Sequence, residues 1–243
     1  MTSTAPDRLE IAPRHLSKGE QEQVAVAEQH VDLDLLRSLI IDLVNIPSPT
    51  GEESTLARFA VSSMRGAGLE ADYQPIDDRQ GNAVGRVPGT GDGASLLLYA
   101  PIDTVTTGNA DEDCPGVGRT LRDDMLPQAV DRGPWVVGLG ASNPKGHAAC
   151  VLAAAAAIRR AGVPLNGDVF VGLGAGGMPT NKRTVPSMTR YNAGQGNCCS
   201  FMLEQGLHTD YAIIAKPGWA VAWEEVGLCW FRLRVNGLFS YVG

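Results

Sequence analysis

One stretch constrains the fold of this chain more than any other: Ser95–Val105, SLLLYAPIDTV. An uninterrupted apolar run, Leu96 to Ala100, is followed within three residues by Asp103. A short apolar run bounded by turn signals is typical of a buried strand. Ligands of open α/β sheets gather at the carboxyl ends of strands, so Asp103 is the first candidate for a functional carboxylate.

Strands of this kind alternate with helices along the chain. Apolar residues recur every three or four positions in the helical segments, whereas short apolar runs mark the strands. The expected helices cover 33–44, the segment that follows Thr50 and ends at Gly66 or Gly68, 148–160 and 198–206. The expected strands cover 69–76, 82–87, 96–100, 135–139, 168–173, 210–215 and 228–235. The alternation predicts an α/β fold: a mostly parallel sheet with flanking helices.

Two local patterns refine this prediction. Thr50 and Glu53 have the spacing of a capping box, which would start the second helix. Residues 106–134 are rich in Asp, Gly and Pro and are expected to form an irregular loop, and long loops inside a compact domain are usually functional or mobile.

Composition narrows the classes of partner and location. The net charge is −7 and no block of Lys or Arg occurs, which argues against nucleic acid. No apolar run approaches the roughly 18 residues of a membrane span, and the polar first thirty residues do not resemble a signal peptide. The five cysteines have no C-x-x-C spacing and are expected to be reduced thiols. We therefore expect a cytoplasmic protein that acts on a small molecule and binds neither nucleic acid nor membrane.

Several segments, in this order, carry a family resemblance. They are Ile46–Glu53 (IPSPTGEE), Asn82–Gly85 (NAVG), the strand ending in Asp103-Thr104-Val105, Gly138–Gly146 (GLGASNPKG) and Tyr211–Ile214 (YAII). Together they resemble the zinc-dependent metallopeptidase family of aminoacylase, acetylornithine deacetylase, succinyl-diaminopimelate desuccinylase and carboxypeptidase G. The resemblance implies a zinc-exopeptidase-like catalytic domain that opens amide bonds. In such enzymes a metal-bound water attacks the bond and a glutamate takes its proton.

The residues that bind zinc in this family are replaced in this chain. Pro101 stands where the family has a histidine, Asn143 where it has the bridging aspartate, Gly174–Gly177 where it has two glutamates, and Lys216 where it has an acidic ligand. Zinc requires nitrogen, sulfur or carboxylate ligands. The resemblance therefore predicts a degenerate site with no metal ligands and no cofactor. Only Asp103 matches, and in the family this residue orients the metal-binding histidine.

The polar residues left at this edge are the candidate site. Asp103, Lys216, Lys145 and Asn143 are candidate catalytic residues, and Ser142 and Lys145 are candidate substrate-binding residues. Asp103 is either a general base or substrate-orienting group, or a buried relic of the family's site. Lys216 either replaces the charge of the metal beside Asp103 or forms a salt bridge that only fills the space.

Two candidate residues of the Gly138–Gly146 segment, Ser142 and Lys145, also have alternative roles. Lys145 either binds a substrate carboxylate or positions the loop. Ser142 and Lys145 match the S-x-x-K spacing in which a lysine activates a serine, although small residues are also ordinary in this loop of the family. His147, at the start of the following helix, is expected to pack or to face solvent.

The resemblance also divides the chain. Residues 1–30 are expected to form an N-terminal tail, 31–226 the catalytic-type domain, and 227–243 the first strand of a truncated lid or dimerisation domain. An unpaired apolar strand recruits partners. We therefore expect a subunit of an amide or C–N hydrolase that needs a second polypeptide to supply the lid and the C-terminal catalytic segment. The alternatives are a non-catalytic scaffold that stabilises an active homologue, and a fragment without independent function.

Overall fold

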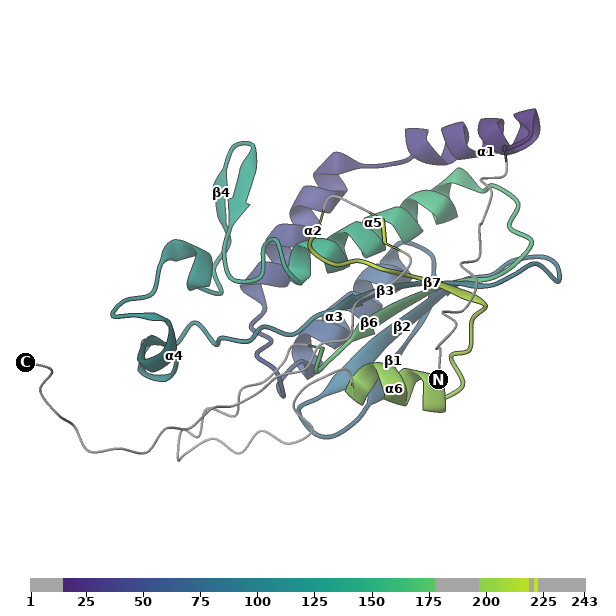
Figure 1. Ribbon diagram of the computed structural model, residues 1–243. Coiled ribbons are helices and arrows are strands. Elements are labelled where there is room, and N and C mark those ends of the chain that lie inside the picture. Colours follow the sequence, from purple (N-terminus) through teal and green to yellow (C-terminus); the bar gives the residue numbers. More distant parts are fainter. Residues whose placement is uncertain (1–14, 178–196, 219–220, 223–243) are drawn as a thin grey trace, which may run out of the picture.

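A computed structural model describes residues 15–177, 197–218 and 221–222 of the chain. These residues form a central sheet with helices on both faces (Figure 1). The helices are α1 Lys18–Gln29, α2 Leu33–Asn45, α3 Ser54–Gly66, α4 Ala110–Val117, α5 Lys145–Ala161 and α6 Asn197–Glu204, with a 3-10 turn η1 at Asp123–Met125. The strands are β1 Glu70–Pro75, β2 Gly81–Val87, β3 Leu96–Pro101, β4 Val130–Arg132, β5 Trp135–Val137, β6 Val169–Gly174 and β7 Tyr211–Ile214.

The central sheet has the strand order β1-β2-β6-β3-β7. Strand β3 pairs in parallel with β6 and with β7, whereas β2 runs antiparallel to both β1 and β6. All strands of the central sheet except β2 therefore point the same way. The predicted α/β fold with a mostly parallel sheet is confirmed, and the ends of β3, β6 and β7 meet at one edge.

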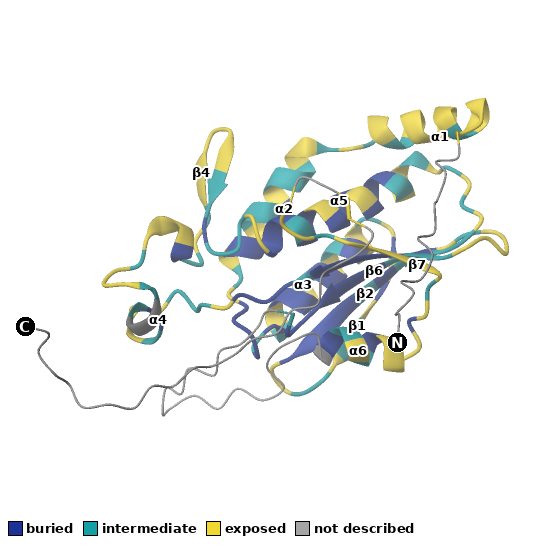
Figure 2. Ribbon diagram, viewed as in Figure 1, coloured by how far each residue is buried: buried dark blue, intermediate teal, exposed yellow. Residues whose placement is uncertain are grey.

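Helices α2, α3 and α5 form the layer on one face of the sheet, and α6 lies on the other (Figure 1). Side chains of a strand alternate between faces. Leu98 and Ala100 of β3 accordingly join the larger core under α5, whereas Leu97 and Tyr99 pack near Met202 of α6. Strand β3 is thus buried from both sides (Figure 2), as its continuous apolar run predicts.

Helix α5 suits close packing because its buried face is built mainly from alanines. Ala148, Ala149, Ala155 and Ala156 are almost completely buried. Small side chains allow the helix to lie close to β3 and β6. The helix begins at Lys145, three residues before the predicted start, and this places Lys145 inside the packed layer.

Two regions differ from the expectation. Within the segment assigned to the tail, α1 forms a helix that begins with a capping box between Ser17 and Glu20. None of the residues of α1 is buried, and it lies on the surface against α5. The apolar periodicity that marks buried helices is therefore missing from its sequence.

Residues 106–134 contain α4, η1 and the start of a β4–β5 hairpin, where the sequence analysis expects an irregular loop. Local polar contacts build this region. The Asp113 carboxylate accepts hydrogen bonds from the backbone N–H groups of Thr107 and Gly108, and Asn109 caps α4. Because these contacts are polar and local, they produce no repeating pattern of apolar residues from which the helix and strand could be predicted. The predicted strand 228–235 and the predicted lid segment 227–243 lie outside the described residues.

Candidate functional site

Asp103 lies just beyond the end of β3 and is completely buried. Its Oδ2 accepts a hydrogen bond from the Thr50 hydroxyl at 2.7 Å, and its Oδ1 accepts one from the Gly177 N–H at 2.8 Å. Charge-assisted bonds of this length are among the stronger ones in proteins. The carboxylate therefore joins the loop before α3 to the turn after β6.

That turn, Ala175–Gly177, is held by side chains from three separate parts of the chain. The Ala175 N–H donates to Asn82 Oδ1 at 3.1 Å, the Gly176 N–H to Glu53 Oε1 at 3.0 Å, and the Gly177 N–H to Asp103 Oδ1. Consecutive N–H groups aimed at side-chain acceptors require an unusual backbone, and Gly176 has a φ of +61°. A Cβ on Gly177 would lie 2.5 Å from Pro101 Cβ. Gly176 and Gly177 are thus required by this turn. We call Glu53, Asn82, Asp103 and the turn they hold the polar corner.

Glu53 is the second buried carboxyl of the polar corner. Its Oε1 also accepts the Gly51 N–H at 2.9 Å. Burial raises the pKa of Glu53 to about 7, an effect that the two backbone N–H groups oppose and the nearby Asp103 reinforces. The predicted capping box between Thr50 and Glu53 is wrong: α3 has no side-chain cap, Thr50 bonds Asp103, and Glu53 bonds the turn. Tertiary acceptors and donors at this edge outcompete the local cap.

Asn82, at the start of β2, links two segments that are far apart in the sequence. Besides accepting from Ala175, it donates from Nδ2 to the Cys198 carbonyl of α6 at 2.8 Å. Thr50, Glu53 and Asn82 are site residues that the sequence pattern did not reveal. For Asn82 the available signal was a short polar side chain at the start of a predicted strand, because a buried amide needs partners.

Lys145 is completely buried at the start of α5. Its ammonium group donates to the Ile46 carbonyl at 2.7 Å, which joins α5 to the end of α2. Burial lowers the pKa of Lys145 to about 8. This contact favours the positioning role among the two alternatives, and substrate binding by Lys145 stays a prediction.

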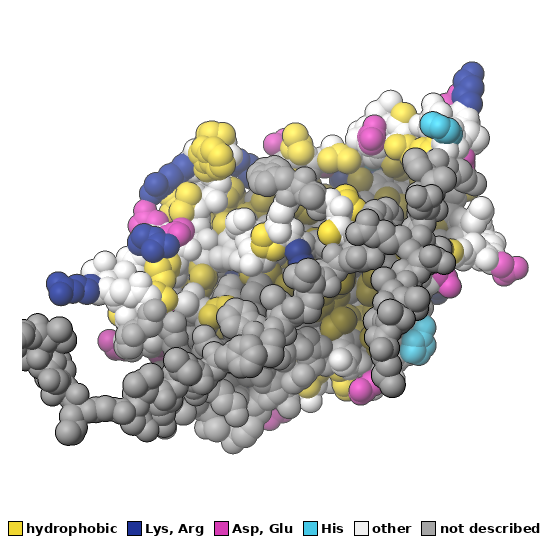
Figure 3. Space-filling model, in the orientation of Figure 1, with side chains coloured by type: hydrophobic (Ala, Val, Ile, Leu, Met, Phe, Trp, Pro, Cys, Tyr) yellow, Lys and Arg dark blue, Asp and Glu magenta, His cyan; other side chains and the backbone are white. Residues whose placement is uncertain are grey.

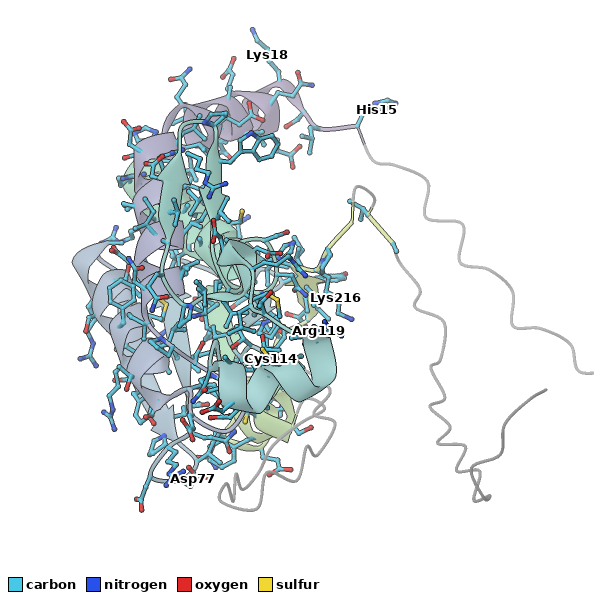
Figure 4. All side chains as sticks on the ribbon, turned by 90° about the vertical axis from the view of Figure 1, so that its left-hand side faces the viewer. His15, Lys18, Asp77, Cys114, Arg119 and Lys216 are labelled. Atoms are coloured by element: carbon cyan, nitrogen blue, oxygen red, sulfur yellow. The ribbon has the colours of Figure 1, made fainter. Side chains whose placement is uncertain are left out.

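The other candidate residues are exposed. Ser142 and Asn143 lie in the loop before α5, and Lys216 follows β7. Figure 4 shows Lys216 on the outside of the ribbon, near the place where the described part of the chain ends. The structure therefore places Asp103 and Lys145 inside the protein and the other three at its surface. The predicted charge pairing of Lys216 with Asp103 stays a prediction, as do the catalytic and substrate-binding roles.

Ser142 lines a shallow apolar groove between α2 and the β4–β5 hairpin, with a volume of about 350 Å³. Leu33 and Trp135, each 70% exposed, also line it. Figure 3 shows exposed apolar side chains along this upper rim of the molecule. None of the other candidate residues lines this groove.

The described residues do not fit a dizinc centre. Within residues 15–177, 197–218 and 221–222, no three His, Cys, Asp or Glu side chains lie close enough to bind a metal ion together. The Pro101 side chain has no donor atom for zinc, and Asp103 already accepts two hydrogen bonds. His147, partly exposed on α5, lies outside any such group, and its Nδ1 has no hydrogen-bond partner.

In the same part of the chain, no helix combines the length and the hydrophobicity needed to cross a membrane.

Comparison with known proteins identifies the type of fold. The sequence matches no protein-family model. It is 26% identical over 195 residues to an N-formyl-4-amino-5-aminomethyl-2-methylpyrimidine deformylase of Bacillus subtilis, an alignment that covers 79% of this chain. It spans only 40% of the length of that curated relative.

Among solved structures, human carnosine dipeptidase 1 superposes with a TM-score of 0.53 at 15% identity, over 81% of this chain and 41% of the other. The LapA aminopeptidase of Legionella pneumophila gives a TM-score of 0.53 at 12% identity, over 85% of this chain and 48% of the other. LapB of the same organism gives a TM-score of 0.54 at 12% identity, over 82% of this chain and 46% of LapB. The chain therefore has a peptidase-like α/β fold and spans less than half of each of these proteins.

Proposed function

We propose that this chain is one part of a hydrolase that opens amide or related C–N bonds, and that further polypeptide completes its reacting site. The likeness to an aminopeptidase and a dipeptidase supports the fold. The sequence similarity to a deformylase supports the bond type, because removal of an N-formyl group breaks an amide C–N bond.

The observation that carries the proposal is the solvent exposure of strand β7. All four residues of this strand are exposed, although β7 belongs to the central sheet (Figure 2). Tyr211 is 68% exposed, Ile213 57% and Ile214 53%. An apolar strand at a sheet edge, open on both faces, recruits further polypeptide or aggregates. The proposed addition would therefore cover β7 next to the edge where the candidate residues lie.

The proposed addition would also supply reacting groups. Asp103 and Lys145 are buried and hydrogen-bonded within the chain, whereas Lys216, Asn143 and Ser142 are exposed. Substrate would meet the exposed residues together with groups from the added polypeptide, while Asp103 holds the loops below in place.

A second candidate is a non-catalytic scaffold that binds and stabilises an active homologue. The specific observation in its favour is the hydrogen bonding of Asp103, whose two oxygens are both engaged by Thr50 and Gly177. A carboxylate held in this way is fully accounted for by structure alone.

The test purifies the 243-residue chain alone and together with the products of neighbouring genes. Oligomeric state, zinc content and hydrolysis of N-formyl and N-acyl amines are measured for each preparation. We expect activity only in the complex. Stoichiometric zinc bound by the isolated chain, or activity of a monomer, would contradict the proposal.

Substitution then separates the two candidates. In an active complex, Lys216→Ala lowers the rate at unchanged assembly if this chain contributes to the site. Unchanged activity of the assembled Lys216→Ala, Asn143→Ala and Ser142→Ala complexes would instead establish the scaffold role.

A further inference from the structure

Strand β7 is the less protected of the two outer strands of the sheet that the described residues form. The other outer strand, β1, contains Glu70, Asp72 and Pro75. Charged residues and proline keep a sheet edge from pairing with another chain. Strand β7 contains neither, and its residues are exposed along its whole length (Figure 2). The edge at β7 is therefore open to pairing with a further strand.

The backbone contacts of β7 show which of its polar groups face outward. The Tyr211 N–H donates to the Ser95 carbonyl at 3.1 Å, and the Ala215 N–H donates to the Tyr99 carbonyl at 2.8 Å. In a parallel pair, alternate residues of a strand direct their N–H and C=O groups toward the same neighbour. Residues 211, 213 and 215 therefore bond β3, whereas Ala212 and Ile214 direct their backbone groups to the open edge.

We propose that a second copy of this chain covers β7, and that the two β7 strands pair antiparallel across a two-fold axis at Ile213. Two-fold dimers are the commonest assemblies of identical chains. The N–H and C=O groups of Ala212 then exchange hydrogen bonds with those of Ile214 of the second copy, and those of Ile214 with Ala212 of the second copy. The sheets of the two copies become one continuous sheet, and the outward backbone groups of both strands are satisfied.

The charges on either side of β7 select this register. Asp210 precedes the strand and Lys216 follows it, and both residues are exposed. With the axis at Ile213, Asp210 lies opposite Lys216 of the second copy at each end of the pair. An axis at Ala212 or at Ile214 would instead place one of these charges opposite an apolar residue. Opposite charges that face one another across an antiparallel pair stabilise it, so the sequence favours the axis at Ile213.

The charge of Asp210 is held beside β7 by Ser95. The N–H and the hydroxyl of Ser95 donate to Asp210 Oδ2 at 2.7 and 2.9 Å. These hydrogen bonds lower the pKa of the Asp210 carboxyl, which is therefore ionised at neutral pH. The position of this charge relative to the strand is thus fixed before a second copy binds.

The apolar side chains of β7 meet one another in the same register. Ile213 pairs with Leu98 of β3 and lies on the same face of the sheet, the face that α5 covers farther in. At the axis, Ile213 faces Ile213 of the second copy in a non-hydrogen-bonded pair, where side chains come closest. Tyr211 lies on this face too, opposite Ala215 of the second copy. Pairing therefore removes apolar surface of both copies from water.

The interface is short, so we expect a dimer that forms reversibly as the protein concentration rises. Interfaces that bury less than about 1,000 Å² are generally weak. The dimer is a property of the isolated chain and does not depend on the hydrolase activity proposed above. A different polypeptide that covers β7 would replace the second copy.

Sedimentation velocity of the isolated 243-residue chain at increasing concentration tests the dimer. We expect Ile213→Lys to raise the dissociation constant more than about tenfold, because like charges would then face one another at the axis. The matched control is Leu33→Lys, which places the same charge on an exposed apolar residue of the α2 groove and should leave the dimer unchanged. A chain that stays monomeric, or a dimer lost in Leu33→Lys but kept in Ile213→Lys, would overturn the proposal and leave the hydrolase proposal untouched.

Disulfide formation tests the position of the axis. In Ile213→Cys the two substituted positions would lie about 4.5 Å apart between Cα atoms, a separation that a disulfide can span, so mild oxidation should give a covalent dimer. In the control Ala212→Cys the two positions lie diagonally, at about 7–8 Å, which is too far. The unsubstituted chain, with its five cysteines, gives the background. Crosslinking of Ile213→Cys no greater than that of Ala212→Cys would overturn the axis at Ile213.

Charge exchange tests the register through the strand ends. Lys216→Asp and Asp210→Lys each place like charges opposite one another in a homodimer, so each variant alone should dimerise more weakly than the unsubstituted chain. Mixed together, the two variants should form a heterodimer, because every strand end then faces an opposite charge. Circular dichroism confirms that both variants are folded, and Lys216→Asp alone suffices if Asp210→Lys is not. Homodimers of Lys216→Asp as stable as the unsubstituted dimer would contradict this register.

Discussion

Strands β3 and β7 are neighbours in the sheet and differ sharply in environment. They pair in parallel, and Leu98 of β3 lies opposite Ile213 of β7. Leu98 is 8% exposed, whereas Ile213 is 57% exposed. Both strands are short apolar runs followed by a charged residue, so their sequences alone predict similar burial. The difference arises from strand order: β3 lies between β6 and β7, and β7 is the edge strand of the sheet that the described residues form.

The same contrast continues past the strand ends. Asp103 after β3 is buried and accepts hydrogen bonds from two segments, whereas Lys216 after β7 is exposed. The charged residue that follows the central strand is therefore buried and hydrogen-bonded, whereas the one that follows β7 is exposed to solvent.

The largest expected difference in stability is between substitution of Asp103 and substitution of Lys216, the charged residues that follow β3 and β7. Asp103→Ala removes two charge-assisted hydrogen bonds: the Gly177 N–H loses its acceptor, and the Thr50 hydroxyl keeps only the Thr104 carbonyl at 3.2 Å. Hydrogen bonds to charged groups contribute about 1.5–3 kcal/mol each, so we expect the free energy of unfolding to fall by about 4 kcal/mol. Lys216→Ala should change it by less than about 0.5 kcal/mol, as is typical of surface positions. Urea unfolding of both variants measures the difference, and equal losses would refute the division between buried and accessible ends.

A smaller effect is expected from the facing residues Leu98 and Ile213. Leu98→Ala removes a side chain from the core under α5 and should cost about 3 kcal/mol, because large-to-small changes in cores cost 2–5 kcal/mol. Ile213→Ala should cost less than about 1 kcal/mol in the isolated chain. If an added polypeptide covers β7, Ile213→Ala should instead weaken assembly, which titration of the partner would detect.

The smallest expected effect concerns Asn82, which joins the turn after β6 to α6. Asn82→Ala should lower the free energy of unfolding by about 2 kcal/mol, because it leaves one buried N–H and one buried carbonyl unpaired. Asn82→Asp keeps the acceptor for Ala175 but loses the donor to Cys198. Hydrogen exchange should therefore remain slow at Ala175 in Asn82→Asp and become fast in Asn82→Ala. Equal exchange rates in the two variants would show that Asn82 Oδ1 does not hold the turn.

Much of the architecture was predictable because it depends on local pattern. The apolar run Leu96–Ala100 and the alanine-rich helix carry their burial in the sequence, and the alternation of strands and helices predicts the sheet. Helix α1 and strand β4 were missed, because polar surface contacts rather than apolar periodicity define them, whereas β5 falls within the predicted strand 135–139.

The polar corner was predictable only in part. Asp103 was identified from its place after a buried strand, and the structure indeed buries it among loop donors. Glu53 was interpreted as part of a helix cap, since Thr50 and Glu53 are close in sequence, whereas their actual partners lie 53 and 123 residues away. Contacts at such separations leave no periodic signal.

The sequence by itself determined the class of fold and the strand that delivers Asp103. These follow from residue chemistry and local periodicity, which need no knowledge of neighbours. Only the tertiary structure decided that Lys145 holds the Ile46 carbonyl, that Glu53 and Asn82 hold the Ala175–Gly177 turn, and that β7 is exposed. The physical reason is that burial and hydrogen-bond partners depend on which strands and loops the sheet order brings together.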